Sequence, residues 1–180
     1  MSLPDLLTVA RAASVPFVVL LYSWNFDGHN YWATALFAAA MATDWLDGRI
    51  ARSRGHSSPL GSLLDPVADK ILVLAVLVML VDQVVVPGWM VALIVVREFL
   101  VTGLRLAALE RGVVLQARDL GKLKTWSQAV AAAVGGFAAA GAWPHRAAWW
   151  ALLVALVLTW VSGLDYARVA PALFRKRVVA

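Results

Sequence analysis

The sequence predicts an all-α integral membrane protein with six transmembrane helices, both termini cytoplasmic, and a polar active-site cavity that opens at the cytoplasmic side. Hydrophobic residues make up 62% of the 180 residues, charged residues only 15%, and the mean hydropathy is +0.76. An average soluble domain is about 45–50% apolar and about 25% charged. A chain this small cannot hide so much apolar surface from water, so lipid must cover part of it.

Six segments have the length and composition of spanning helices, because crossing the hydrocarbon core takes about 20 mostly apolar residues. The predicted spans are residues 6–23, 31–52, 60–81, 88–110, 122–142 and 147–167. The breaks between them hold residues typical of loops: Asn25 to Asn30, Gly55 to Pro59, Pro87–Gly88, Arg111 to Gly121, and Trp143–Pro144. We see no linker composition and no internal repeat, so a single domain over residues 1–180 is expected.

The placement of lysine and arginine predicts the orientation, since these residues gather on the cytoplasmic side. Loops 24–30 and 82–88 contain neither residue, and loop 142–147 contains only Arg146. The opposite side collects Arg11, Arg49, Arg52, Arg54, Arg105, Arg111, Arg118, Lys122, Lys124, Arg168, Arg175, Lys176 and Arg177. Both termini should therefore be cytoplasmic, in a multi-pass protein of the cell membrane. The net charge of +5 then favours anionic lipid or a phosphate substrate over nucleic acid as a partner.

Four aspartates lie within the predicted spans, where a charge is expensive and indicates a function or a buried partner. Asp44 and Asp47 are three residues apart near the end of the second span, and Asp65 and Asp69 are four apart at the start of the third. Each pair therefore shares one helical face. The loop between the two spans is short, so we expect antiparallel neighbouring helices that bring all four carboxylates together.

Two interpretations of this carboxylate cluster are open. Arg49, Arg52 and Lys70 could neutralise part of its charge, giving a structural network that ties two helices together. Divalent cations explain it better, because such a density of hard oxygen ligands suits Mg²⁺, Mn²⁺ or Ca²⁺. Two metal ions could be accommodated, an arrangement common in displacement at phosphorus. Thiolate ligands are excluded because the chain has no cysteine.

Small residues lie next to the aspartates. Gly48 follows Asp47 directly, Ala51 lies one turn later, and Gly61 precedes Asp65 by one turn. The lack of side-chain bulk leaves room for a ligand against the helix backbone. Arg52 could offer a guanidinium fork to a phosphate group.

The combined pattern resembles the signature of the CDP-alcohol phosphatidyltransferase family. It reads Asp44-x-x-Asp47-Gly48-x-x-Ala51-Arg52, followed by Gly61-x-x-x-Asp65-x-x-x-Asp69. The resemblance implies that the first three aspartates bind two divalent cations, Mg²⁺ or Mn²⁺. It implies that Asp69 helps to coordinate metal and acts as the general base. Gly48, Ala51, Arg52 and Gly61 would line the site of the cytidine diphosphate group, and the protein would be a homodimer.

Cationic residues in the later spans are candidates for binding the phosphate of the second substrate. The candidates are Arg97, Arg105, Lys124 and Arg168. Arg97 is the most informative because it lies well inside an apolar stretch. Its neighbour Glu98 is expected on another face, since adjacent helix residues diverge. Arg97 would then need an anion from elsewhere, and a substrate phosphate would serve.

Three further stretches resemble the phosphatidylglycerophosphate synthase branch of that family: residues 97–105, 121–128 and 162–166. The opening residues 4–11 match too, except that Asp5 stands where asparagine is usual; Thr8 and Arg11 stay candidates for donor contacts. The implied reaction joins CDP-diacylglycerol to sn-glycerol 3-phosphate and yields phosphatidylglycerol phosphate and CMP. The alternatives are another acceptor (phosphatidylglycerol, inositol phosphate or serine) and a cation transporter that uses the same carboxylates.

Overall fold

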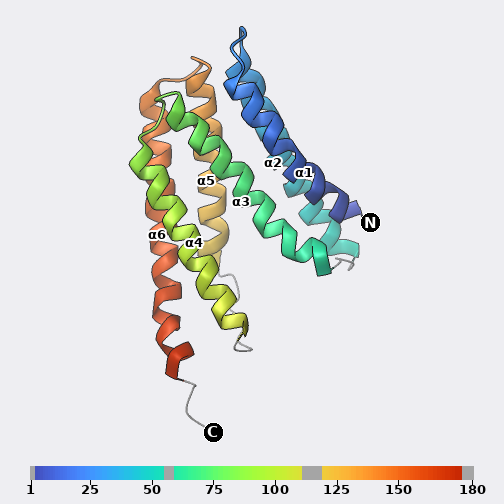
Figure 1. The fold of residues 1–180 in the computed structure, drawn as a ribbon, viewed down its shortest axis with the longest axis vertical. Helices are drawn as coiled ribbons and strands as arrows, with labels where there is room; N and C mark the ends of the chain where they lie inside the picture. Colours follow the sequence, from blue (N-terminus) through green and yellow to red (C-terminus); the bar gives the residue numbers. More distant parts are fainter. Residues whose placement is uncertain (1–2, 55–58, 111–118, 176–180) are drawn as a thin grey trace.

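The protein is all-helical throughout the part that its structure, a computed structural model, describes: residues 3–54, 59–110 and 119–175 (Figure 1). Side chains are described for residues 9–43, 70–108, 121 and 123–164. The helices are α1 (Leu3–Ser23), α2 (His29–Arg54), α3 (Pro59–Asp82), α4 (Gly88–Glu110), α5 (Asp119–Ala139) and α6 (His145–Arg175). Their bounds follow the six predicted segments within a few residues, except that α6 continues to Arg175.

The helices run alternately up and down. The connections after α1, α3 and α5 lie at one end of the molecule, called here the loop end, and both chain ends point toward the opposite end (Figure 1). The most extensive helix pairing is between α5 and α6, and α4 packs beside α6. On the other side of the molecule, α1 packs along both α2 and α3.

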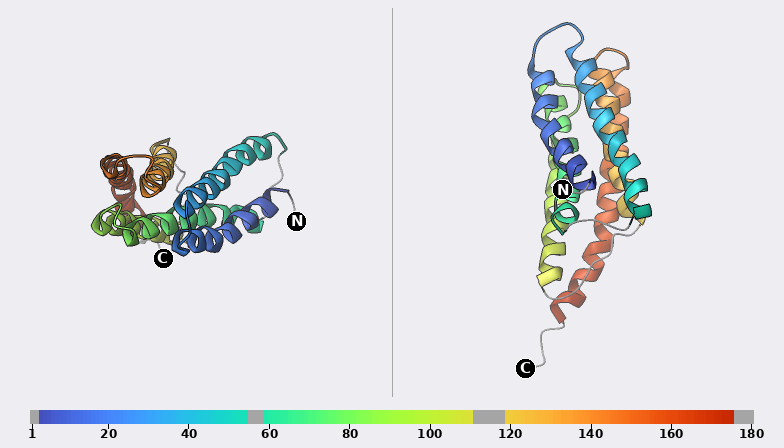
Figure 2. Two further views of the ribbon diagram at one scale, coloured as in Figure 1. Left: turned by 90° about the horizontal axis from the view of Figure 1, so that it is seen from above. Right: turned by 90° about the vertical axis from the view of Figure 1, so that its right-hand side faces the viewer.

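The sequence predicted α2 and α3 as antiparallel neighbours. The two helices run in opposite directions, as expected, but they contact each other only sparsely. Seen from above in Figure 2, α2 diverges from α3, and α1 is the helix that they share. A short connection fixes where two helices meet, whereas side-chain packing along their lengths fixes their crossing.

The core consists of aliphatic residues from all six helices, with Leu72, Leu77, Met90, Ile94 and Leu152 among the fully buried side chains. Small residues of α5 allow this close approach. A Cβ atom on Gly135 would overlap Leu80, and one on Gly136 would overlap the hydroxyl groups of Thr34 and Tyr22. Close backbone approach at small residues is the usual packing of helices in lipid.

A neutral polar network ties the helices together near the loop end. The hydroxyl groups of Tyr22 and Thr34 are 3.0 Å apart, and Thr34 donates to the carbonyl oxygen of Asn30 at 2.6 Å. Asn30 donates through Nδ2 to the carbonyl oxygen of Ala139 at 3.0 Å. Gln83 donates through Nε2 to Asn30 Oδ1 at 2.8 Å and to the carbonyl oxygen of Tyr22 at 3.2 Å. We call Tyr22, Asn30, Thr34 and Gln83 the neutral network.

The outer surface is strongly apolar. Large hydrophobic side chains are exposed on every helix, and exposed tryptophans near the loop end include Trp24, Trp32, Trp89 and Trp143. Among the described residues, His145–Leu164 is the segment that is long and apolar enough to cross a membrane, with a mean hydropathy of 1.9. Val9–Ser23 is a shorter apolar helix. The six-span topology predicted above therefore stays a prediction.

Candidate functional site

The aspartate motif lies on helical backbone, as its spacing requires. Asp44 and Asp47 belong to the second half of α2, and Asp65 and Asp69 to the first half of α3. The side chains of several predicted site residues lie outside the described set: Thr8, Asp44, Asp47, Gly48, Ala51, Arg52, Gly61, Asp65, Asp69 and Arg168. The described side chains by themselves contain no cluster of three or more histidines and carboxylates. The convergence of the four carboxylates is therefore still a prediction.

The described part of the site begins at Lys70, the residue that follows Asp69 in α3. Lys70 donates through Nζ to the hydroxyl oxygen of Thr102 at 2.8 Å. The same Nζ lies 3.5 Å from Oε2 of Glu98. Both partners belong to α4, so Lys70 links the helix of the aspartate motif to a buried group of charges.

Glu98 is the centre of this group. Its Oε1 accepts hydrogen bonds from Arg97 Nη1 at 3.0 Å, from Lys124 Nζ, and from Gln128 Nε2 at 3.3 Å. Arg97 donates through Nη2 to the hydroxyl oxygen of Ser162 at 2.5 Å, which reaches α6. Gln128 also donates to Thr159 Oγ1 at 2.8 Å.

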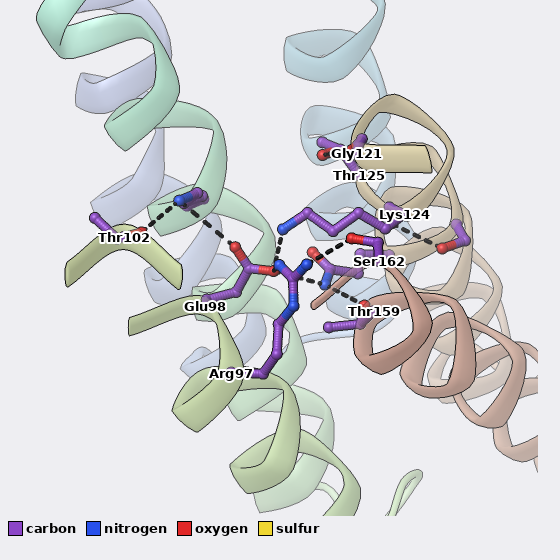
Figure 3. Close-up of polar contacts among 11 residues, drawn as sticks. Arg97, Glu98, Thr102, Gly121, Lys124, Thr125, Thr159 and Ser162 are labelled. Carbon is purple, nitrogen blue, oxygen red and sulfur yellow. Dashed lines mark hydrogen bonds and ion pairs between the residues drawn. The ribbon is translucent and has the colours of Figure 1, made fainter. Parts of the chain in front are cut away.

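These contacts join α3, α4, α5 and α6 around one carboxylate, and Figure 3 labels the members from α4, α5 and α6. We call this group the Glu98 cluster. Its members are Lys70, Arg97, Glu98, Thr102, Lys124, Gln128, Thr159 and Ser162.

The prediction that Arg97 lacks an anion within the chain is wrong, because Glu98 is its partner. The Cα–Cβ bonds of adjacent helix residues do diverge. The arginine side chain, however, has enough rotatable bonds to turn its guanidinium back to the next carboxylate. Both side chains are almost fully buried, with 2% of Arg97 and 3% of Glu98 exposed. A buried charge is strongly destabilising when it lacks a partner, at about 3–5 kcal/mol, so the pairing is favoured over divergence.

The Glu98 cluster carries more positive than negative charge. Lys70, Arg97 and Lys124 all lie within ion-pairing distance of Glu98, so three cations share one carboxylate among the described side chains. Lys124 is also largely buried, with 8% exposed, whereas the Lys70 side chain is 33% exposed. The excess charge suits the binding of an anion that approaches from the Lys70 side.

Gly163 shapes the position of Arg97. A Cβ atom at Gly163 would lie 3.0 Å from Arg97 Nε, closer than side chains normally pack. Nε is itself buried and has no hydrogen-bond partner among the described residues. The guanidinium group therefore lies against the backbone of α6, where a larger residue would displace it.

The comparison with known sequences decides the family. The model of the CDP-alcohol phosphatidyltransferase family matches residues 1–161. The chain belongs to this family. The resemblance inferred from the aspartate motif is thereby confirmed.

Members of the family from several bacteria are similar over most of their length. The chain is 42% identical over 142 residues to the CDP-diacylglycerol–glycerol-3-phosphate 3-phosphatidyltransferase of Bacillus subtilis, covering 72% of this chain and 74% of that protein. It is 41% identical over 170 residues to a probable phosphatidylglycerophosphate synthase of Mycobacterium tuberculosis, covering 92% and 79%. It is 35% identical over 138 residues to the CDP-diacylglycerol–glycerol-3-phosphate 3-phosphatidyltransferase of Escherichia coli K12, covering 73% of this chain and 75% of that protein.

The predicted acceptor residues of this family member are only partly brought together. Arg97 and Lys124 meet at the same carboxylate oxygen, whereas Arg105 lies about two turns further along α4 and is partly buried. Sequence reasoning missed Glu98 as the centre of the cluster. The signal was available, because the cost of a charge within an apolar segment applies to Glu98 as much as to Arg97.

Proposed function

We propose that this protein is a phosphatidylglycerophosphate synthase, which transfers the phosphatidyl group of CDP-diacylglycerol to sn-glycerol 3-phosphate. The products are phosphatidylglycerol phosphate and CMP. The proposal is carried by the agreement between the aspartate motif and the relatives named for this activity, which are 35–42% identical over most of the chain. The relatives compared above are named for glycerol 3-phosphate or for phosphatidylglycerophosphate, so neither another acceptor nor transport is favoured.

The proposed reaction is a displacement at phosphorus in which Asp69 takes the proton and CMP is the leaving group. The glycerol hydroxyl attacks the β-phosphorus of CDP-diacylglycerol, and its proton passes to the Asp69 carboxylate. The new P–O bond forms as the bond to the CMP oxygen breaks. Positioning and electrostatic stabilisation supply most of the catalysis in such transfers.

Asp44, Asp47, Asp65 and Asp69 would hold two divalent cations, Mg²⁺ or Mn²⁺. The helical spacing of each pair and the hard oxygen donors fit such ions. When bound, the ions neutralise the negative charge on the pyrophosphate and on the departing CMP. Thr8, Gly48, Ala51, Arg52 and Gly61 would bind the CDP-diacylglycerol, the small residues by leaving room and Arg52 by its guanidinium.

Arg97, Arg105, Lys124 and Arg168 would bind the phosphate of glycerol 3-phosphate. The positive excess of the Glu98 cluster supports this assignment for Arg97 and Lys124. The cluster also includes Lys70, the direct neighbour of the proposed base. An acceptor whose phosphate lies at the cluster would have its hydroxyl on the side of Asp69.

We place the protein in the cell membrane with six spans, both termini and the active site on the cytoplasmic side, and two copies in a homodimer. The positions of lysine and arginine and the apolar outer surface support the membrane orientation. A cytoplasmic site at the membrane boundary would accept both a lipid-tailed donor and a water-soluble acceptor.

The decisive assay offers the purified chain CDP-diacylglycerol and one alcohol at a time, with Mg²⁺ and Mn²⁺ compared. Glycerol 3-phosphate should give CMP and a phosphatidylglycerol phosphate product, and omission of the metal should stop the reaction. Phosphatidylglycerol, inositol phosphate and serine should be inert. Turnover with one of these and none with glycerol 3-phosphate would refute the acceptor assignment. Ion flux in liposomes without any CMP release would favour the transporter instead.

A further inference from the structure

The unusual feature of the Glu98 cluster is that a carboxylate lies at the centre of a proposed anion-binding site. A site made only of cations would attract a phosphate more strongly by Coulomb's law. Here Glu98 Oε1 accepts from Arg97 and Lys124, and Oε2 lies near Lys70. The cations come from three different helices, α3, α4 and α5. The Glu98 carboxylate therefore aligns three side chains that are distant from one another in the sequence.

A carboxylate in this place lowers the cost of holding the cations close together. Three like charges at short range repel one another strongly where water is excluded. Without a common acceptor, each of the long side chains could also adopt several rotamers, and binding would have to order them. Glu98 removes both difficulties before any ligand arrives, since it compensates one charge and fixes the direction of each donor group.

We propose that Glu98 is a positioning residue that holds Lys70, Arg97 and Lys124 in the arrangement that binds the phosphate of the acceptor. The ligand class is a dianionic phosphate monoester attached to a small alcohol. The cluster carries two positive charges in excess among these four side chains, which a dianion would neutralise. Glu98 thereby determines the preference for a phosphorylated alcohol over a neutral one. This inference rests on the proposed function.

Removal of the Glu98 charge separates positioning from simple electrostatics, because the two predict opposite signs. If only the local charge mattered, Glu98→Gln would remove one negative charge and lower the KM for glycerol 3-phosphate. If Glu98 positions the cations, they lose their common acceptor and spread apart, and the KM rises. Hydrogen bonds to charged groups are worth about 1.5–3 kcal/mol, so the expected rise is about tenfold or more.

The experiment measures initial rates of the full-length chain in detergent for wild type, Glu98→Gln and Glu98→Asp. Glu98→Gln should raise the KM for glycerol 3-phosphate and change the KM for CDP-diacylglycerol by less than about twofold. Glu98→Asp keeps the charge and should give an intermediate rise. Inorganic phosphate should inhibit in competition with glycerol 3-phosphate, and its inhibition constant should rise in parallel. The preference for glycerol 3-phosphate over unphosphorylated glycerol should fall.

Thr34→Val is the matched control, because it removes a buried polar group from the neutral network and leaves the Glu98 cluster intact. It should leave both KM values unchanged. If Glu98→Gln does not fold, Ser162→Ala decides, since it frees Arg97 from α6 while every charge is kept. We expect a rise of about threefold in the KM for glycerol 3-phosphate, smaller than in Glu98→Gln because Arg97 keeps its hydrogen bond to Glu98.

Several outcomes overturn the inference while the proposed function stands. They are an unchanged or lowered KM for glycerol 3-phosphate in Glu98→Gln, an equal rise of both KM values, and an unchanged preference over glycerol. Unchanged kinetics in both Glu98→Asp and Ser162→Ala would also overturn it. A folded wild type that releases no CMP with glycerol 3-phosphate refutes the proposed function, and the inference falls with it.

Discussion

The two buried polar groups of this protein are built on different principles. The neutral network near the loop end contains no ionised side chain, and its side chains bond to one another and to the backbone carbonyls of Tyr22, Asn30 and Ala139. The Glu98 cluster lies farther from the loop end and, among the described side chains, holds three cations around one carboxylate. The first is balanced and closed, which suits a structural joint. Among the described side chains, the second has an excess of positive charge, which suits an anionic ligand.

The comparison predicts that substitutions at the two sites affect different measured quantities. Changes to the neutral network should lower the free energy of unfolding and leave the kinetic constants alone. Changes around the Glu98 cluster and the aspartate motif should alter the kinetic constants.

The largest effect is expected from Asp69→Asn, next to the Glu98 cluster in the chain. The change removes the proposed base and keeps the shape of the side chain, so turnover should fall by about 10²–10⁴-fold. The melting temperature and the binding of CDP-diacylglycerol should be largely preserved. An assay of CMP release measures the turnover, and a thermal denaturation curve measures the melting temperature. Retained turnover would remove Asp69 from the role of base.

The next largest effect should come from Gly136→Ala, beside the neutral network. The new methyl group would overlap the hydroxyl groups of Thr34 and Tyr22. Overpacking of this kind costs about 1–3 kcal/mol of stability. Chemical denaturation measures the loss, and the KM values of the folded enzyme should not change. Gly103→Ala is the control, because nothing lies within 4 Å of the position that its new methyl group would take. Equal losses in the two variants would show that the contact with Thr34 and Tyr22 is unimportant.

Gly163→Ala tests the cluster without removing any of its members. The methyl group would lie 3.0 Å from Arg97 Nε and push the guanidinium away from α6. We expect the KM for glycerol 3-phosphate to rise by about three- to tenfold, less than for the full loss of a hydrogen bond to a charged group, because the guanidinium is displaced and not removed. Steady-state kinetics with each substrate varied in turn measures this. Gly103→Ala again serves as the control, and a rise confined to CDP-diacylglycerol would contradict the assignment.

The smallest effect is expected from Thr34→Val, which keeps the side-chain shape and removes one hydroxyl group. Its loss leaves the Tyr22 hydroxyl without that partner, at a cost of about 1 kcal/mol. Denaturant titration should detect this decrease. If acceptor kinetics changed as much as in Gly163→Ala, the distinction between the two polar groups would be lost.

The sequence predicted the helices well because length and apolar composition determine them locally. It missed the last part of α6, since a search for apolar residues stops where charged residues begin, whereas the helix continues to Arg175. It predicted α2 and α3 as antiparallel neighbours, and the two helices do run in opposite directions, but their contacts are sparse among the described residues. Connectivity constrains only the ends of helices, and the role of α1 as their shared neighbour depends on packing between residues distant in sequence.

The family could be predicted because its motif is a fixed spacing within two helices, which a sequence displays directly. The Glu98 cluster could not be predicted in the same way. Lys70, Glu98, Lys124 and Ser162 come from four helices, and no spacing relates them. The error over Arg97 had a specific cause, namely that a rule about helix faces was applied to a side chain long enough to reach around the helix.

The adjacency of Asp69 and Lys70 has a consequence for how this enzyme could change its substrate during evolution. Both residues belong to the continuous helix α3, so one stretch of backbone determines the position of the proposed base and of one cation of the cluster. A mutation that moved this stretch would disturb the chemistry together with the choice of acceptor. Arg97, Lys124 and Ser162 lie on the other helices of the cluster and can be replaced independently. A new acceptor preference would therefore arise most readily through α4, α5 and α6.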